Sequence, residues 1–231
     1  MTGLIAAACV FLGIHLAVSG TKLRDVLTRA IGENPYRGLF AMSALGSLIW
    51  LCVAYNHASA SPANLVLFEP GQTLRNLAIP VLLLSFALAV PGALMLNPTS
   101  AGQEKADIRG VLRITRHPFL WGVLLWAGFH LIGSGTLAST ILFATFVILT
   151  AVGARTIDAK VRRRQPAHWQ TVAAQTSSLP FAAIAAGRNR FVPSEYFDWR
   201  ISAAAVLFAI FLYFHNYLFS MSPYPNNWLP S

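Results

Sequence analysis

Six apolar stretches, separated by polar or basic connections, divide this chain. They lie at about 3–19, 38–55, 76–96, 117–133, 137–153 and 201–219. A helix needs roughly 20 apolar residues to cross the ~30 Å hydrocarbon core of a bilayer, and tilt or local thinning accommodates small differences in length. The pattern therefore predicts an all-α fold, a polytopic membrane bundle of about six transmembrane helices, formed as a single domain over residues 1–231.

The basic residues are placed on alternate connections. Sixteen of the seventeen Lys and Arg residues lie in the first, third and fifth connections, in groups of four, four and eight. The second connection holds only Arg75, and the tail 220–231 carries no charged side chain. Short loops rich in Lys and Arg mark the cytoplasmic side of a membrane protein. Both termini are therefore predicted to be non-cytoplasmic, in a multi-pass protein of a bacterial inner membrane.

The fifth connection, about 155–200, is the only long one. Its first part, Asp158 to Gln170, is expected to form a basic surface helix at the cytoplasmic leaflet. Its less polar part around Ser177–Ile184 is expected to rest on the membrane interface or to re-enter it. The opposite side of the membrane has only short connections, so any chemistry is expected within the bundle or at its cytoplasmic face.

Composition excludes an ordinary soluble domain, because 55% of the residues are hydrophobic and only 11% are charged. A net charge of +9 would otherwise indicate nucleic-acid binding. Here the positive charge is explained by its one-sided placement, so the expected partner is the lipid bilayer and no nucleic acid. The two cysteines, Cys9 and Cys52, lie inside apolar stretches and are expected to be small buried packing groups.

Four of the six histidines lie at membrane depth. His15, His130 and His215 are within apolar stretches, and His117 opens the fourth stretch. An ionisable side chain at depth is costly and calls for a reason. One reason is a hydrogen bond from a neutral imidazole to a neighbouring helix. Another is ligation of haem iron, which needs only one or two histidines in an apolar, aromatic pocket.

The remaining histidines, His57 and His168, are expected to be solvated loop residues. No pair of histidines has the His-x-x-x-His spacing of a zinc site.

The segment Arg116-His117-Pro118 forms a compact entrance to the fourth stretch. Proline suits the first turn of a helix, where a missing N–H costs nothing. Arg116 can bind an anionic group such as a haem propionate or a lipid or cofactor phosphate. It can equally anchor the helix by reaching to the headgroups.

Several motifs together resemble the NnrU family of integral membrane proteins and, within the same larger family, the zeta-carotene isomerases of plants and cyanobacteria. The resemblance runs in order along nearly the whole chain. Its motifs are Gly13-Ile14-His15-Leu16, Ser19-Gly20, Leu23-Arg24, Tyr36-Arg37-Gly38-Leu39-Phe40, Arg113-Ile114-Thr115-Arg116-His117-Pro118, Phe129-His130, Pro180-Phe181-Ala182-Ala183-Ile184, Gly187-Arg188 and His215.

This resemblance implies a b-type haem. By analogy with the isomerase, His15 and His130 are the axial-ligand candidates, and His117 with Arg116 forms the catalytic motif. The implied activity is haem-dependent cis-trans isomerisation of a polyene, a small apolar substrate. The NnrU proteins are associated instead with denitrification and nitric oxide metabolism, which makes nitric oxide the other expected partner of the iron.

Helix geometry adds His215 to the candidate ligands. His15 lies seven residues before Lys22, about 10 Å from the cytoplasmic boundary at 1.5 Å per residue. By the same measure His130 and His215 lie at about 21 and about 22 Å. The resemblance names His15 and His130, whereas depth favours His215 as the partner of His130.

Two other function classes remain open. The sequence Arg-His-Pro-Phe-Leu-Trp-Gly also looks like the S-adenosylmethionine-binding motif of membrane methyltransferases that act on isoprenylcysteine or phospholipids. Those proteins carry a paired Glu-Glu further on, where this chain has only Asp158. A non-catalytic assembly factor or a transporter is the third class, although the apolar stretches lack the carboxylates that proton coupling uses.

Overall fold

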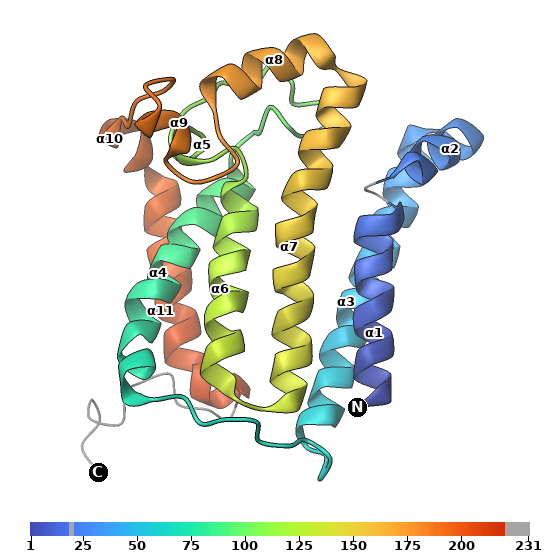
Figure 1. Ribbon diagram of the computed structural model, residues 1–231, viewed down its shortest axis with the longest axis vertical. Helices are drawn as coiled ribbons and strands as arrows, with labels where there is room; N and C mark the ends of the chain where they lie inside the picture. The colour runs from blue at the N-terminus through green and yellow to red at the C-terminus, as the bar shows by residue number, and fades with distance from the viewer. Residues whose placement is uncertain (19–20, 220–231) are drawn as a thin grey trace. The chain divides into compact units, whose positions relative to one another are not determined.

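The computed structural model describes residues 1–18 and 21–219. The regular secondary structure of these residues is helical apart from one isolated bridge between Val66 and Thr136, and turns or irregular segments connect the helices. The elements, labelled in Figure 1, are α1 (Thr2–Leu12), the π-helix η1 (Gly13–Val18), α2 (Lys22–Ile31), α3 (Glu33–Ser59), α4 (Gln72–Leu94), α5 (Val111–Ile114), α6 (Pro118–Ser134), α7 (Leu137–Arg164), α8 (Pro166–Gln175), α9 (Ala182–Ala185), α10 (Pro193–Tyr196) and α11 (Trp199–Phe219).

Each predicted apolar stretch coincides with a helix. The continuous run of α1 and η1 covers the first stretch, and α3, α4, α6, α7 and α11 cover the others. Among the described residues, α3, α4, α7 and α11 are long and apolar enough to cross a membrane. A fifth span is counted if Thr2–Val18 and Lys22–Ile31, which differ in direction by 78°, form one broken span. The chain is therefore a multi-pass membrane protein with four or five candidate spans.

The difference from six spans comes from the two shortest apolar helices. The described part of the first stretch, Thr2–Val18, and the helix α6 are both 17 residues long. At 1.5 Å per residue, 17 residues extend about 26 Å. This is slightly less than a ~30 Å hydrocarbon core.

The chain divides into two compact units that alternate along the sequence. The first unit comprises residues 1–70 and 130–160, and the second comprises residues 71–129 and 161 onward. Helices α6 and α7 each begin in one unit and end in the other.

The first unit is built on α1, α3 and most of α7. Helices α1 and α3 run side by side (Figure 1), and α1 buries Leu4, Ala7, Ala8 and Phe11. Tyr55 of α3 contacts Ser139 of α7 through their hydroxyls, 3.2 Å apart. The turn before α7 is fixed by Gly135, whose φ is +69° and whose carbonyl accepts a 2.7 Å hydrogen bond from the N–H of Leu67. A Cβ at Gly135 would lie 2.0 Å from the Phe68 carbonyl oxygen, so only glycine fits there.

In the second unit, α4 packs closely against α6 and α11. Ser85 of α4 donates a 2.8 Å hydrogen bond to the carbonyl of Gly122 in α6. A Cβ at Gly122 would lie 2.5 Å from the Ala89 nitrogen, so the absence of a side chain is what permits this approach. Phe86 of α4 contacts Phe208 and Phe211 of α11, with ring centroids 5.6 and 5.8 Å apart.

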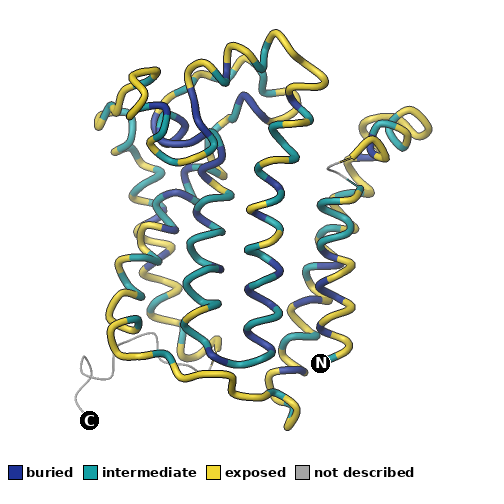
Figure 2. Tube along the Cα trace, in the orientation of Figure 1, coloured by how far each residue is buried: buried dark blue, intermediate teal, exposed yellow. Residues whose placement is uncertain are grey.

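The outer faces of the long helices are apolar and exposed, as the yellow and teal tube in Figure 2 shows. Met42 of α3 is 71% exposed and Tyr213 of α11 is 76% exposed. Such surfaces are expected where lipid replaces water. The same faces carry Cys9 and Cys52, so the prediction that these cysteines are buried was wrong. An apolar sequence context does not separate a protein-facing position from a lipid-facing one.

The bounds predicted for the basic surface helix, Asp158–Gln170, were also wrong. Helix α7 continues through Asp158 to Arg164, and α8 begins at Pro166, in the position where proline starts a helix. The break falls at Gln165. Proline disfavours a helical conformation in the residue before it, which ends the preceding helix there.

Candidate functional site

His15 lies in the π-helix η1, near the C-terminal end of the first apolar stretch. Its Nδ1 lies 2.8 Å from the carbonyl oxygen of Phe11. A carbonyl only accepts, so Nδ1 carries the proton and Nε2 keeps its lone pair. Within residues 1–18 and 21–219 no hydrogen bond engages this Nε2. Single π-turns occur frequently at functional sites, and the tautomer here is the one that metal-bound histidines adopt.

Aromatic rings surround His15. Its ring centroid lies 4.4 Å from that of Phe11 and 5.6 Å from that of Phe40. Phe11 in turn lies 5.6 Å from Phe146 of α7, in an edge-to-face arrangement. The imidazole is half-buried among these rings. This is an apolar, aromatic setting of the kind that holds a flat macrocycle.

His130 belongs to the same unit and to the same row of rings. It stacks on Phe143 of α7, with centroids 4.8 Å apart and planes inclined by 29°. Phe143 and Phe146 are three residues apart on α7 and so lie on one face of the helix. Both histidines therefore lie against rings that lead to α7, His15 by way of Phe11 and Phe146 and His130 by way of Phe143. We call these rings the aromatic row of the first unit.

The donor set fits a haem in its chemistry. It offers one imidazole with an available Nε2, a second imidazole on the same aromatic row, and few competing polar groups. Among the described residues, no group of three or more His, Cys, Asp or Glu side chains gathers in a way that could hold a metal ion.

Arg116 and His117 lie in the second unit, at a junction of backbone segments. His117 is buried and immediately precedes α6, which begins at Pro118 as the sequence predicted. The N–H of Arg116 donates to the carbonyl of Ser177 at 3.0 Å, and its carbonyl accepts from Asn97 Nδ2 at 2.9 Å. The guanidinium of Arg116 lies 4.9 Å from the ring centroid of Trp169 in α8, within cation–π range.

The segment that follows Ser177 docks on the same junction. The carbonyl of Ser178 accepts from both Thr115 Oγ1 and Trp121 Nε1, each at 2.7 Å. The N–H of Phe181 donates to the carbonyl of Ile114 at 2.8 Å. These contacts tie the less polar part of the fifth connection to the start of α6.

A salt bridge that the sequence did not predict joins Arg113 to the segment around Glu195. Arg113 donates to both carboxylate oxygens of Glu195, at 2.7 and 2.8 Å, and to Asn189 Oδ1 at 2.8 Å. The N–H of Gly110 donates to the same carboxylate at 3.0 Å. The hydrogen bond from Arg113 is the main reason that the pKa of Glu195 falls from 4.5 to about 2. Residues 76 to 85 positions apart in sequence meet here, and no local pattern predicts their pairing.

The other three histidines lie in helices α3, α8 and α11. His168 is not a solvated loop residue, because it lies in α8 and its Nε2 is 2.8 Å from the carbonyl of Pro98. His57 is exposed as predicted, but it lies in α3 and not in a loop, and it lines a cavity of about 290 Å³ where α1 meets the far end of α3. His215 lies on α11 in the second unit, with its ring 4.9 Å from Phe219. The expectation from helix depth that His215 partners His130 remains a prediction.

Comparison with known proteins identifies relatives of this chain. It is similar to 15-cis-zeta-carotene isomerase, chloroplastic, of Arabidopsis thaliana, at 24% identity over 191 residues, 81% of this chain and 51% of that protein. The protein of the same description from Zea mays is 24% identical over 225 residues, 95% of this chain and 61% of the relative. The chain thus spans between half and two thirds of the length of these curated relatives. No solved structure matches it significantly.

The sequence profile of the NnrU protein family matches residues 3–223, nearly the full length of both structural units. That match includes every histidine and arginine of the candidate site. The chain therefore belongs to the NnrU family.

Proposed function

We propose that this chain is a haem protein of the bacterial inner membrane, with one b-type haem held by His15 and His130. The observation that carries the proposal is the tautomer of His15. The Phe11 carbonyl fixes a proton on Nδ1, which in the neutral imidazole leaves Nε2 as a ligand atom beside aromatic rings.

Phe11, Phe40, Phe143 and Phe146 supply the apolar walls of the site. They offer rings against which a flat macrocycle or a polyene can lie. When bound, the haem would supply an iron centre able to interact with a double bond or with nitric oxide.

The activity we propose is cis-trans isomerisation of a small apolar polyene. The names of the two plant relatives support it, since both are 15-cis-zeta-carotene isomerases. His117 and Arg116 would contribute at the start of α6. Arg116 would bind an anionic group, and His117 would be needed for turnover. The expected readout is conversion of a cis polyene by the reduced, haem-loaded protein in detergent, followed by chromatography.

Several outcomes separate this activity from other functions. Tight nitric oxide binding to the reduced protein, without polyene turnover, would favour a role in nitric oxide metabolism. Binding of S-adenosylmethionine by a colourless protein would favour a membrane methyltransferase. A colourless protein that binds neither would favour an assembly factor.

We further propose six spans, with both termini outside the cytoplasm. The one-sided placement of sixteen basic residues supports this orientation, with α6 and the first stretch as short spans. Single cysteines at Ser61 and Ala101, introduced into a variant lacking Cys9 and Cys52, test it. A membrane-impermeant maleimide applied to intact spheroplasts should label the first site and not the second. The opposite result would invert the topology.

A further inference from the structure

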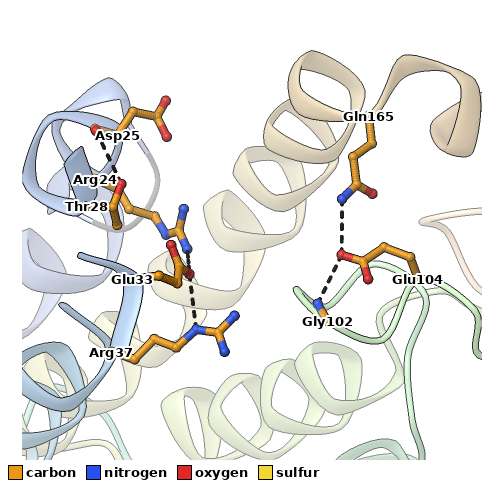
Figure 3. Close-up of polar contacts among 8 residues, drawn as sticks. All are labelled: Arg24, Asp25, Thr28, Glu33, Arg37, Gly102, Glu104 and Gln165. Atoms are coloured by element: carbon orange, nitrogen blue, oxygen red, sulfur yellow. Dashed lines mark hydrogen bonds and ion pairs between the residues drawn. The ribbon is translucent and has the colours of Figure 1, made fainter. Parts of the chain in front are cut away.

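Arg24 is a buried arginine in the first unit, on the first turn of the amphipathic helix α2. Its side chain is 8% exposed. Figure 3 shows it reaching toward Glu33 at the start of α3, and its Nη2 pairs with Glu33 Oε1. The other terminal nitrogen, Nη1, is buried and has no hydrogen-bond partner within the described part of the chain.

The carboxylate of Glu33 does not balance the positive charge of the arginines around it. Arg37 also approaches Glu33, with its Nε 3.1 Å from the same Oε1 that Arg24 contacts. Two guanidinium groups therefore share one carboxylate oxygen, as Figure 3 shows. A buried charge with an unsatisfied N–H is costly unless a further partner supplies an acceptor. The missing acceptor is thus expected to be negatively charged.

Aromatic contacts connect this guanidinium to the proposed iron ligand. Arg24 lies 5.3 Å from the ring centroid of Tyr36, and Tyr36 stacks on Phe40 with centroids 6.1 Å apart. Phe40 is the ring that meets His15 edge to face at 5.6 Å. Arg24 is therefore two rings away from His15, on the side of the basic first connection.

We propose that Arg24 Nη1 binds a carboxylate of the haem, a propionate, and so orients the macrocycle whose iron His15 ligates. The inference rests on the proposed haem function. Arginine is the side chain best suited to a carboxylate in a partly buried site, because its planar group presents several N–H donors in fixed directions. Helix α2 differs in direction from Thr2–Val18 by 78°. In the proposed six-span topology, Arg24 then lies where the first span meets the membrane surface. Carboxylates there stay near headgroups and water, while the ring system lies among Phe40 and Phe11.

The test compares haem with its dimethyl ester, which has the same ring and iron but no ionised carboxylate. Full-length wild-type protein and Arg24→Gln are titrated with each compound in detergent. The wild type should prefer haem, and Arg24→Gln should weaken haem binding by about tenfold to hundredfold, the range for a hydrogen bond to a charged group. Its affinity for the ester should hardly change. Arg37→Gln is the matched control, because Arg37 pairs with the same carboxylate but is 52% exposed, and it should keep the preference.

The outcomes separate this proposal from the haem proposal itself. Equal loss of haem and ester binding in Arg24→Gln, with a normal elution profile, would mean a structural role and would overturn the assignment. An unchanged haem preference in Arg24→Gln, with loss of co-purifying anionic phospholipid, would assign Nη1 to a lipid phosphate and overturn it too. A wild type that binds neither compound would defeat both proposals. Arg24→Lys keeps the charge and should retain part of the preference, which guards against a variant that misfolds.

Discussion

The aromatic row of the first unit and the backbone junction of the second unit both hold polar side chains among apolar helices, but they satisfy them differently. At the junction, Thr115, Trp121 and Arg113 all donate to acceptors elsewhere in the chain. Around His15 the chain leaves ligand atoms available, the Nε2 of the imidazole and the Nη1 of Arg24. These three junction donors are thus satisfied by the protein itself, whereas the first unit presents groups suited to an added molecule.

This difference in hydrogen-bond partners distinguishes polar groups with a structural role from polar groups that bind a ligand. A polar side chain in an apolar environment needs a partner, and the identity of that partner indicates its role. A polar side chain whose hydrogen-bond partner lies in a distant loop holds two segments of the chain together. A hydrogen-bond donor or acceptor without a partner, beside aromatic rings, indicates a ligand-binding site.

The largest expected effect is on cofactor binding by His15→Ala. Loss of the Nε2 that His15 presents beside Phe11 and Phe40 should abolish most of the bound haem, measured as haem per protein after purification. His57→Ala is the matched control, because His57 lies in the same unit but is exposed, and it should bind haem as the wild type does. Retention of haem in His15→Ala together with its loss in His215→Ala would instead support the depth argument.

A second effect concerns packing in the second unit. Gly122→Ala places a Cβ 2.5 Å from the Ala89 nitrogen and should destabilise the fold by about 1–3 kcal/mol, as overpacked substitutions do. The measurement is the Tm of the detergent-solubilised protein. Gly128→Ala, on the same helix with no atom within 4 Å of the new Cβ, should leave the Tm nearly unchanged. Equal Tm values for the two variants would show that α4 and α6 do not approach as described.

The third and smallest effect is the pH dependence of the Arg113–Glu195 clamp. The folded state holds the pKa of Glu195 at about 2 instead of 4.5, chiefly through the Arg113 hydrogen bond. The stabilisation from a carboxyl with a lowered pKa is fully present above 4.5 and is lost as the pH falls toward 2. Glu195→Gln should therefore lower the Tm at pH 6, with a difference from the wild type that shrinks between pH 4.5 and pH 2. A difference that stays constant over this range would contradict the charged pairing.

The helices were predictable from the sequence because hydrophobic length is a strong signal in a membrane protein. All six apolar stretches became helices, and Pro118 starts α6 as expected. The sequence could not show which face of a span meets protein, so Cys9 and Cys52 were misplaced. The expected surface helix missed the break at Gln165, because the local effect of Pro166 outweighed the continuity of the basic segment.

The candidate site was predictable only at its histidines. The cost of an imidazole at membrane depth drew attention to His15 and His130, and the resemblance paired them. His130 contacts α7 at Phe143, and Phe11, the neighbour of His15, contacts it at Phe146; these phenylalanines look like ordinary apolar residues in the sequence. Arg24 was counted as a topological charge and as part of the motif Leu23-Arg24, with no binding role of its own. Its burial against Glu33 depends on the turn between α2 and α3, where Gly32 adopts a φ of +88°.

The most direct test of the haem proposal is an absorption spectrum of the full chain, purified in detergent from cells supplied with a haem precursor, before and after dithionite. The account predicts a Soret band that shifts on reduction, with about one haem per chain, and its disappearance in His15→Ala. A colourless wild type that also fails to take up added haem would contradict it. The imidazoles of the aromatic row would then serve only in packing.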